Sequence, residues 1–313
     1  MWTLFRSTPK FALSGCKKQF SIIPPVQLRR MYSHQHPSLA DVVERLQNFA
    51  PEKLAEPWDN VGLIIEPATP IPISRILLTI DLTENVFEEA VNTKSNLVIS
   101  YHPPIFEGLK KITQDNWKGR IVAKCLEKGI AVYSPHTAWD SVRGGVNDWF
   151  GSFLSNGYDE GKPIIPNAEF PHCGAGRLYE SRTPDSGMTL EQIIMELKEH
   201  IIIPDEHIPA ALVHPLNQKI KSIALCAGSG ASVLKNQKAE VYITGEMSHH
   251  AILDANHSGT SVILTHHTNS ERNFLHDAVK ILSDRLMGIS VMSTASTDHD
   301  PLKLDSFYTE HTE

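Results

Sequence analysis

Five short apolar runs in this chain each end on a side chain that can bind a metal ion. The runs are residues 76–81, 97–102, 130–136, 241–246 and 262–267, and they end on Asp81, His102, His136, Glu246 and His267. Runs of four to six aliphatic and β-branched residues, separated by helix-length segments, are typical of buried parallel strands. In open α/β sheets, ligands bind at the carboxyl ends of the strands. The pattern therefore predicts an α/β fold whose strand ends converge on one metal site.

Composition narrows the classes of function. The chain has 313 residues, 41% of them apolar, which is enough for one large domain or two ordinary ones. Its net charge of -7 and pI near 6.1 argue against direct nucleic-acid binding, which usually needs a basic face. No apolar run approaches 18 residues, so we expect no membrane span. The four cysteines lack any CxxC spacing, which favours buried free thiols over disulfides or a zinc ribbon.

The first 40 residues differ from the rest of the chain in amino-acid composition and charge. They contain six Lys or Arg residues and several Ser and Thr, and the first acidic residue is Asp41. This composition is typical of an organelle transit peptide, and the sequence around Arg30 is similar to a mitochondrial processing site. We therefore predict a removable transit peptide over residues 1–32 and import into mitochondria, with a cytoplasmic fraction left open. A disordered basic tail is the alternative.

The order of elements predicts two similar α/β lobes, each a mixed sheet flanked by helices, with some α+β character. The first lobe is expected over 33–150 and the second over 151–261, with an irregular insertion at 151–219. Residues 262–313 are expected to form a strand–helix segment that returns to the first lobe. The expected helices are 39–49, 83–93, 116–128, 189–200, one from 248, and 269–287, and further strands are expected at 61–65 and 220–226.

Two candidate ligand groups follow strands of the first lobe. His102 precedes Pro103, which holds its backbone out of the helical region and can aim its ring off the strand end. The alternative is a histidine that bonds only to a loop carbonyl. His136 and Asp140 lie four residues apart after the next strand, and Asp140 is either a ligand or a cap of the following turn.

The second lobe offers a stronger local pattern. His267 and Glu271 are spaced i, i+4 across a strand–helix junction, so both can face the strand ends. Thr268 and Glu271 also match a capping box, which needs no metal. Glu246 is a further candidate carboxylate, or an anion at a helix N-terminus. One of the adjacent His249 and His250 is a candidate for proton transfer.

Imidazole and carboxylate ligands suit zinc, iron or manganese. One or two such ions would activate water for hydrolysis, and a nearby histidine would transfer the proton. Other chemistries lack their motifs, since the chain contains no GxSxG and no GxxxxGK[ST] sequence.

Five motifs, in order, resemble those of the Nif-three-like family, whose bacterial members are catalogued as GTP cyclohydrolase 1 type 2 homologues. They are residues 55–62 (AEPWDNVG), 100–106 (SYHPPIF), 136–140 (HTAWD), 244–246 (TGE) and 267–271 (HTNSE). The resemblance runs from about residue 39 to the C-terminus and is weakest between 151 and 219. It implies two α/β lobes, a dinuclear metal site in the cleft between them, and a hexameric ring.

Carried over residue by residue, the family's metal ligands fall on His102, Asp140, His267 and Glu271. Where bacterial members have a second histidine this chain has Tyr101, a poor ligand, which puts the second metal in question. The resemblance implies a metal-dependent, cyclohydrolase-like hydrolase of a nucleotide-like small molecule, with His136 or His249 as catalytic groups. The alternative is a non-catalytic, metal-binding oligomer that carries metal or binds protein partners.

Overall fold

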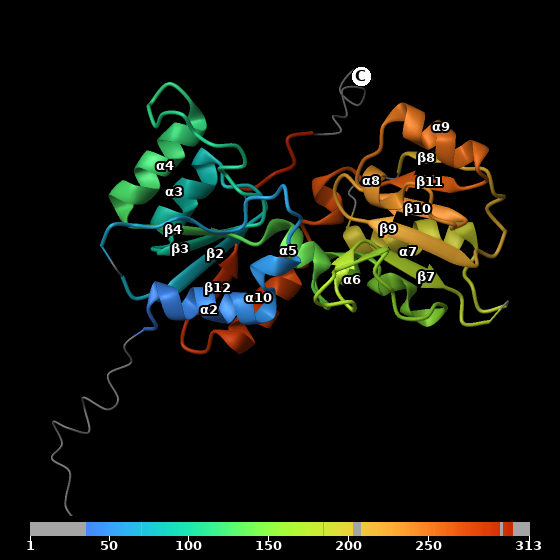
Figure 1. The fold of residues 1–313 in the computed structure, drawn as a ribbon, viewed down its shortest axis with the longest axis horizontal. Coiled ribbons are helices and arrows are strands. Elements are labelled where there is room, and N and C mark those ends of the chain that lie inside the picture. The colour runs from blue at the N-terminus through green and yellow to red at the C-terminus, as the bar shows by residue number, and fades with distance from the viewer. Residues whose placement is uncertain (1–35, 70, 184, 203–207, 295–296, 303–313) are drawn as a thin grey trace, which may run out of the picture. The chain divides into compact units, whose positions relative to one another are not determined.

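The computed structural model describes residues 36–69, 71–183, 185–202, 208–294 and 297–302, which all belong to one structural unit. The expected transit peptide, residues 1–32, lies outside the described residues. Helices and sheets alternate through the described chain (Figure 1). No helix among the described residues is both long and apolar enough to cross a membrane.

The first sheet has five strands in the order β1-β4-β3-β2-β12. Their bounds are Gly62–Ile65 (β1), Arg75–Thr79 (β2), Leu97–Ser100 (β3), Ala131–Ser134 (β4) and Ser290–Ser293 (β12). Four of the strands run parallel and β1 is antiparallel to β4. The sheet is therefore mixed, and the carboxyl ends of β2, β3 and β4 lie side by side at one edge.

Helices cover both faces of this sheet (Figure 1). Strand residues alternate between two cores, so Leu77 packs with helices α3 (Glu84–Asn92) and α4 (Trp117–Lys128). Its neighbours on β2 pack with α2 (Leu39–Phe49) and α10 (Phe274–Arg285) on the other face. A strand with both faces buried has a continuous apolar sequence, which explains the pattern.

The second sheet has the order β7-β9-β10-β11-β8. Its strands are Arg177–Glu180 (β7), Ala210–Ala211 (β8), Ser222–Cys226 (β9), Val241–Thr244 (β10) and Ser261–Leu264 (β11). The three central strands are parallel and both edge strands are antiparallel. Helix α7 (Leu190–Ile201) packs on one face, and α8 (Ala231–Leu234) and α9 (His249–His257) lie on the other (Figure 1). The prediction of an α/β fold with two helix-flanked mixed sheets is confirmed.

Short elements connect the main helices and strands. They are α5 (His136–Ser141), α6 (Val146–Phe150), the 3-10 turns η1 (Glu52–Leu54), η2 (Ser152–Asn156) and η3 (Thr268–Ser270), and the small hairpin β5 (Ile165–Pro166) and β6 (Gly174–Ala175). The fully buried Arg177 on β7 donates to Asp148 on α6 at 2.5 Å and to the carbonyls of Ser141 and Val142. A buried charge is stable only when it is paired and hydrogen-bonded, so this network fixes α5 and α6 against the second sheet.

Local capping signals place most helices within a residue of their expected starts. Ser38 and Asp41 form a capping box on α2, Thr189 and Gln192 form one on α7, and Ser248 caps α9. Helix α10 instead begins at Phe274, five residues after the expected start, because residues 268–270 form the 3-10 turn η3.

The stretch 151–219, expected to be irregular, supplies both edge strands of the second sheet. Its apolar pattern is weak because β8 is two residues long and β7 buries a charged side chain, Arg177. Strand β11 begins at Ser261 and pairs with β10 in the second sheet. Helix α10 then packs against the first sheet, and the last strand, β12, pairs with β2 in that sheet. The three described cysteines, Cys125, Cys173 and Cys226, are free and buried.

Candidate metal centre

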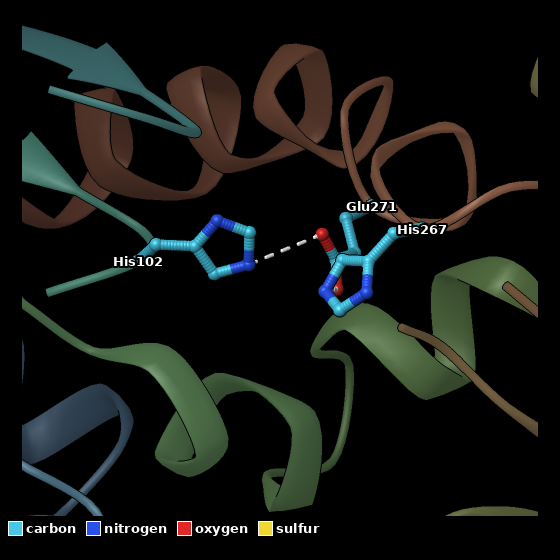
Figure 2. A group of neighbouring side chains, drawn as sticks. All are labelled: His102, His267 and Glu271. Carbon is cyan, nitrogen blue, oxygen red and sulfur yellow. Dashed lines mark ion pairs between the residues drawn. The ribbon is translucent and has the colours of Figure 1, made fainter. Parts of the chain in front are cut away.

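Three side chains from the two sheets meet at one point (Figure 2). His102 follows β3, while His267 and Glu271 flank η3 after β11. One ligand atom from each lies within 4.8 Å of the other two. The Nε2 atoms of His102 and His267 each lie 3.4 Å from a different carboxylate oxygen of Glu271. The convergence predicted for these three residues is therefore present in the fold.

The local backbone explains how Glu271 comes to face the two imidazoles. The expected alternative was a capping box between Thr268 and Glu271. Instead, the Thr268 hydroxyl donates to Asp300, and no side chain caps the turn η3. His266 has a φ of 65°, a left-handed conformation that is uncommon for a residue with a side chain. Such strain is held in place by surrounding structure and clusters at functional sites.

A carboxylate stands behind each imidazole of the group. The Nδ1 atom of His102 lies 3.0 Å from Asp81 Oδ1, and that of His267 lies 3.0 Å from Glu246 Oε1. Because an ionised carboxylate only accepts hydrogen bonds, each Nδ1 must carry a proton and each Nε2 is left to face the centre. This carboxylate–histidine arrangement orients metal-binding histidines and raises their basicity.

The geometry fits a metal ion. His102 Nε2 and Glu271 Oε2 are buried, and neither makes a well-formed hydrogen bond to any described residue. Their separation of 3.4 Å is close to the roughly 3.3 Å between donors around a tetrahedral ion with 2.0–2.1 Å bonds. A Cβ on Gly228 would lie 2.6 Å from Glu271 Oε1 and 3.2 Å from His267 Nε2. The loop after β9 can therefore approach Glu271 and His267 this closely only because residue 228 is a glycine.

The protonation of His102 shows how strongly anionic this point is. Burial acts to lower the pKa of His102, but its hydrogen bond to Asp81 and the carboxylate of Glu271, 3.4 Å from Nε2, outweigh burial and raise the pKa to about 10. Without a metal, Nε2 of His102 therefore also carries a proton at neutral pH, in addition to the proton on Nδ1. A cation that binds Nε2 must displace this proton, so metal binding releases protons.

Asp140, the fourth expected ligand, is not one of the three residues whose ligand atoms lie within 4.8 Å of one another, although its charge interacts with those of His102 and Glu271. Its Oδ1 accepts a hydrogen bond from the hydroxyl of Tyr101 at 2.5 Å. Burial raises the pKa of Asp140 to about 6, and burial together with Asp140 raises the pKa of Tyr101 well above its usual value. The Tyr101 hydroxyl therefore engages Asp140. His102, His267 and Glu271 are the one group of three or more potential ligands found close together among the described residues.

His136 stands beside the metal group without belonging to it. Its ring centroid lies 5.4 Å from that of His102 and 5.6 Å from that of Tyr101. The Nδ1 atom lies 2.7 Å from Asp59 Oδ1, and Asp59 also accepts from the backbone and hydroxyl of Thr137. Burial acts to raise the pKa of Asp59, but the bonds from His136 and Thr137 hold it below its usual value. His136 has a φ of 30°, the second strained histidine at this site.

His249 is the remaining residue expected to take part in catalysis. It is exposed as the first residue of α9, and its ring contacts His250 at a centroid distance of 5.5 Å. No interaction in the described part of the chain joins it to the metal group. Asp59 was not predicted as part of the site, because it lies in a loop before β1 and follows no apolar run.

Comparisons with known proteins show which family the chain resembles. The profile of the family described as Duf34/NIF3 (NGG1p interacting factor 3) matches residues 37–301. NIF3-like protein 1 of Drosophila melanogaster is 46% identical over 276 residues, which cover 88% of this chain and 92% of the fly protein. The Schizosaccharomyces pombe protein named Protein NIF3 homolog is 40% identical over 274 residues, covering 84% and 96% of the two chains.

Solved structures show the same architecture. A hypothetical protein of Staphylococcus aureus aligns with a TM-score of 0.73 and 25% identity, covering 86% of this chain and 99% of that one. A Bacillus cereus protein related to NIF3 aligns with a TM-score of 0.70 and 20% identity, covering 87% and 98%. The two-sheet arrangement is therefore shared along nearly the full length of these structures.

Proposed function

The chain belongs to the NIF3 family, and from the meeting of His102, His267 and Glu271 we propose that it is a metal-dependent hydrolase. The substrate we propose is a nucleotide-like small molecule, by analogy with the cyclohydrolase label of bacterial relatives. The observation that carries the proposal is the pairing of this group with a further imidazole, His136, beside it.

The donor set suits one divalent ion per chain, of zinc, iron or manganese. Such an ion supplies Lewis-acid chemistry, polarising the bond under attack and lowering the pKa of a water molecule. Asp81 and Glu246 keep the two ligand imidazoles in the tautomer that presents Nε2. Glu271, which is 3% exposed, supplies the negative charge that favours a cation at this point.

The proton chemistry in this proposal belongs to His136. Asp59 holds the Nδ1–H of His136, so Nε2 is the atom that accepts a proton from attacking water and returns it to the leaving group. The side chain of Asp59 is fully buried and is fixed by two bonds from Thr137, which keeps the imidazole in one orientation. The role predicted for His249 stays a prediction, since no interaction of the described residues ties it to the centre.

A second candidate function is a metal carrier or scaffold without catalysis. It is favoured by the Tyr101–Asp140 hydrogen bond, because that bond leaves three protein ligands in place of a fuller two-metal set. A site with few protein ligands exchanges its ion more readily, which suits a protein that hands metal on to partners.

The variant His136→Gln distinguishes the hydrolase from the metal carrier, because the two functions predict different results. In the hydrolase, loss of the proton acceptor lowers turnover of GTP or another nucleotide by about 10²- to 10⁴-fold, while metal content stays the same. In a carrier, neither metal content nor transfer to a chelator changes. A His276→Gln variant on the exposed face of α10 is the control. Turnover that survives in His136→Gln contradicts the hydrolase proposal.

Three further proposals rest on sequence and family alone. We propose a homohexamer, as the family resemblance implies, and protein partners are part of the carrier hypothesis. Import into mitochondria is proposed from the basic, acid-free composition of residues 1–40.

A further inference from the structure

Two large aromatic side chains next to the metal centre are exposed to solvent. Trp58, in the loop before β1, is 62% exposed, and Phe106, in the loop after β3, is 45% exposed. Their ring centroids lie 6.0 Å apart with an angle of 59° between the planes. Single exposed aromatics are common, but a contacting pair beside a group of metal ligands indicates a binding surface.

The backbone on both sides of these rings is held rigidly. Asn60 Nδ2 donates to the carbonyl of Ile105 at 2.5 Å, which joins the Trp58 loop to the Phe106 loop. Asp59, directly after Trp58, bonds to His136 and Thr137. The two rings are therefore presented to solvent by anchored loops, as in sites whose residues are preorganised for a ligand.

Both rings border the candidate proton acceptor. The His136 ring lies 6.2 Å from Trp58 and 6.3 Å from Phe106, between centroids, and the angles between planes are 75° and 83°. The His136 ring also lies 5.4 Å from that of the ligand His102, between centroids. A flat molecule placed against Trp58 or Phe106 therefore lies one side chain away from the metal group.

We propose that Trp58 and Phe106 form a stacking platform that holds the flat heteroaromatic ring of the substrate beside His136. This inference rests on the proposed function and deepens it by naming the residues that select the substrate class. Stacking on an aromatic face needs no charge on the protein, which suits a chain with a net charge of -7. It also accounts for rings of this size staying uncovered when most large apolar side chains here are buried.

The test compares two probes by equilibrium dialysis against metal-free and zinc-loaded protein. Guanosine monophosphate carries a purine ring, and ribose 5-phosphate has the same sugar phosphate without the ring. We expect the nucleotide to bind at least about tenfold more tightly, because stacking of one base contributes about 5- to 100-fold in affinity. Equal binding of the two probes, or binding of neither, overturns the proposal.

Variants of Trp58 test whether the tighter binding of the nucleotide comes from stacking on its ring. Trp58→Ala and Trp58→Leu should each weaken nucleotide binding about tenfold, whereas Trp58→Phe should keep most of it, since leucine is apolar but has no aromatic face. Phe106→Leu should also weaken binding. Trp117, 44% exposed at the start of α4, makes no ring contact with this cluster in the described chain, so Trp117→Leu is the matched control. Unchanged binding in Trp58→Leu contradicts the platform.

Two further readouts test whether Trp58 acts on the nucleotide directly. Metal content should be equal in wild type and Trp58→Leu, and a loss of metal would mean that Trp58 supports the structure of the site instead. A lower mass of Trp58→Leu in light scattering would mean that the rings form a subunit interface, which also overturns the inference. Discrimination between the probes in a protein that binds no metal would leave the platform standing and refute the metal-dependent hydrolase.

Discussion

At the level of single residues, the same histidine–carboxylate pair occurs three times at the centre. His102, His136 and His267 each place Nδ1 against a carboxylate, within 2.7–3.0 Å. Since the carboxylate accepts the hydrogen bond from Nδ1–H, each ring has a defined orientation, and Nε2 is the nitrogen left for a metal ion or a proton. For His102 and His267 that nitrogen faces Glu271, and for His136 we propose that it faces the substrate.

Asp140 allows a prediction about pH in the metal-free protein. Burial raises the pKa of Asp140 from 3.8 to about 6 in the folded state, so between these values the folded chain holds a proton that the unfolded chain releases. The contribution of Asp140 to stability is therefore fully present below pH 3.8 and is lost as pH rises through 6. Asp140→Asn should remove this dependence and stabilise the protein at pH 7.5 by roughly 1–3 kcal/mol.

Urea unfolding in EDTA at pH 5 and pH 7.5 measures this effect. The gain of Asp140→Asn over wild type should be clearly larger at pH 7.5 than at pH 5. Asp284→Asn, on the exposed side of α10, controls for the loss of one negative charge. An equal difference at the two pH values would contradict a protonated Asp140 in the folded state.

At the scale of elements, patterns that are local in sequence were sufficient for most of the fold. Strands β3 and β10 are buried on both faces, and their continuous apolar runs predicted them within two residues of their observed ends. The edge strands β7 and β8 were missed because an edge strand needs little apolar sequence, and Arg177 interrupts what pattern β7 has. Their pairing with β9 and β11 is decided by tertiary contacts.

A substitution in the loop after β9 should weaken metal binding. Gly228 has a φ of 63°, and a Cβ there would meet Glu271 and His267. Gly228→Ala should therefore displace the metal ligands and lower metal affinity by at least about tenfold, beyond the roughly 1–2 kcal/mol cost of the left-handed backbone.

Gly129→Ala is the matched control for this loop. Gly129 has a φ of 68°, but a Cβ there would meet nothing within 4 Å, so this variant carries the backbone strain without the clash. Zinc titration with a competing chelator measures both variants. Equal zinc affinity in the two would show that the close approach of Gly228 does not matter for the site.

At the scale of the whole molecule, the centre exists only because the two sheets meet. His102 comes from the first sheet, while His267 and Glu271 come from the second, 165 and 169 positions later in the chain. The strand ends predicted that the candidate ligands converge on one site, but no local pattern states that this site lies between two separate sheets. That arrangement was expected only from the family resemblance. The Tyr101–Asp140 hydrogen bond was not predicted for the same reason, because the two residues are 39 positions apart and come into contact only when the chain folds.

We propose that His102, His267 and Glu271 hold one metal ion between the two sheets. Elemental analysis of protein purified without chelators and reconstituted with zinc, iron or manganese tests it most directly. We expect about one ion per chain in wild type and in the control His276→Ala, and none in His102→Ala/Glu271→Ala, with circular dichroism showing that each variant is folded. Two ions per chain would contradict the assignment of Asp140 to Tyr101, and no ion in wild type would contradict the metal centre itself.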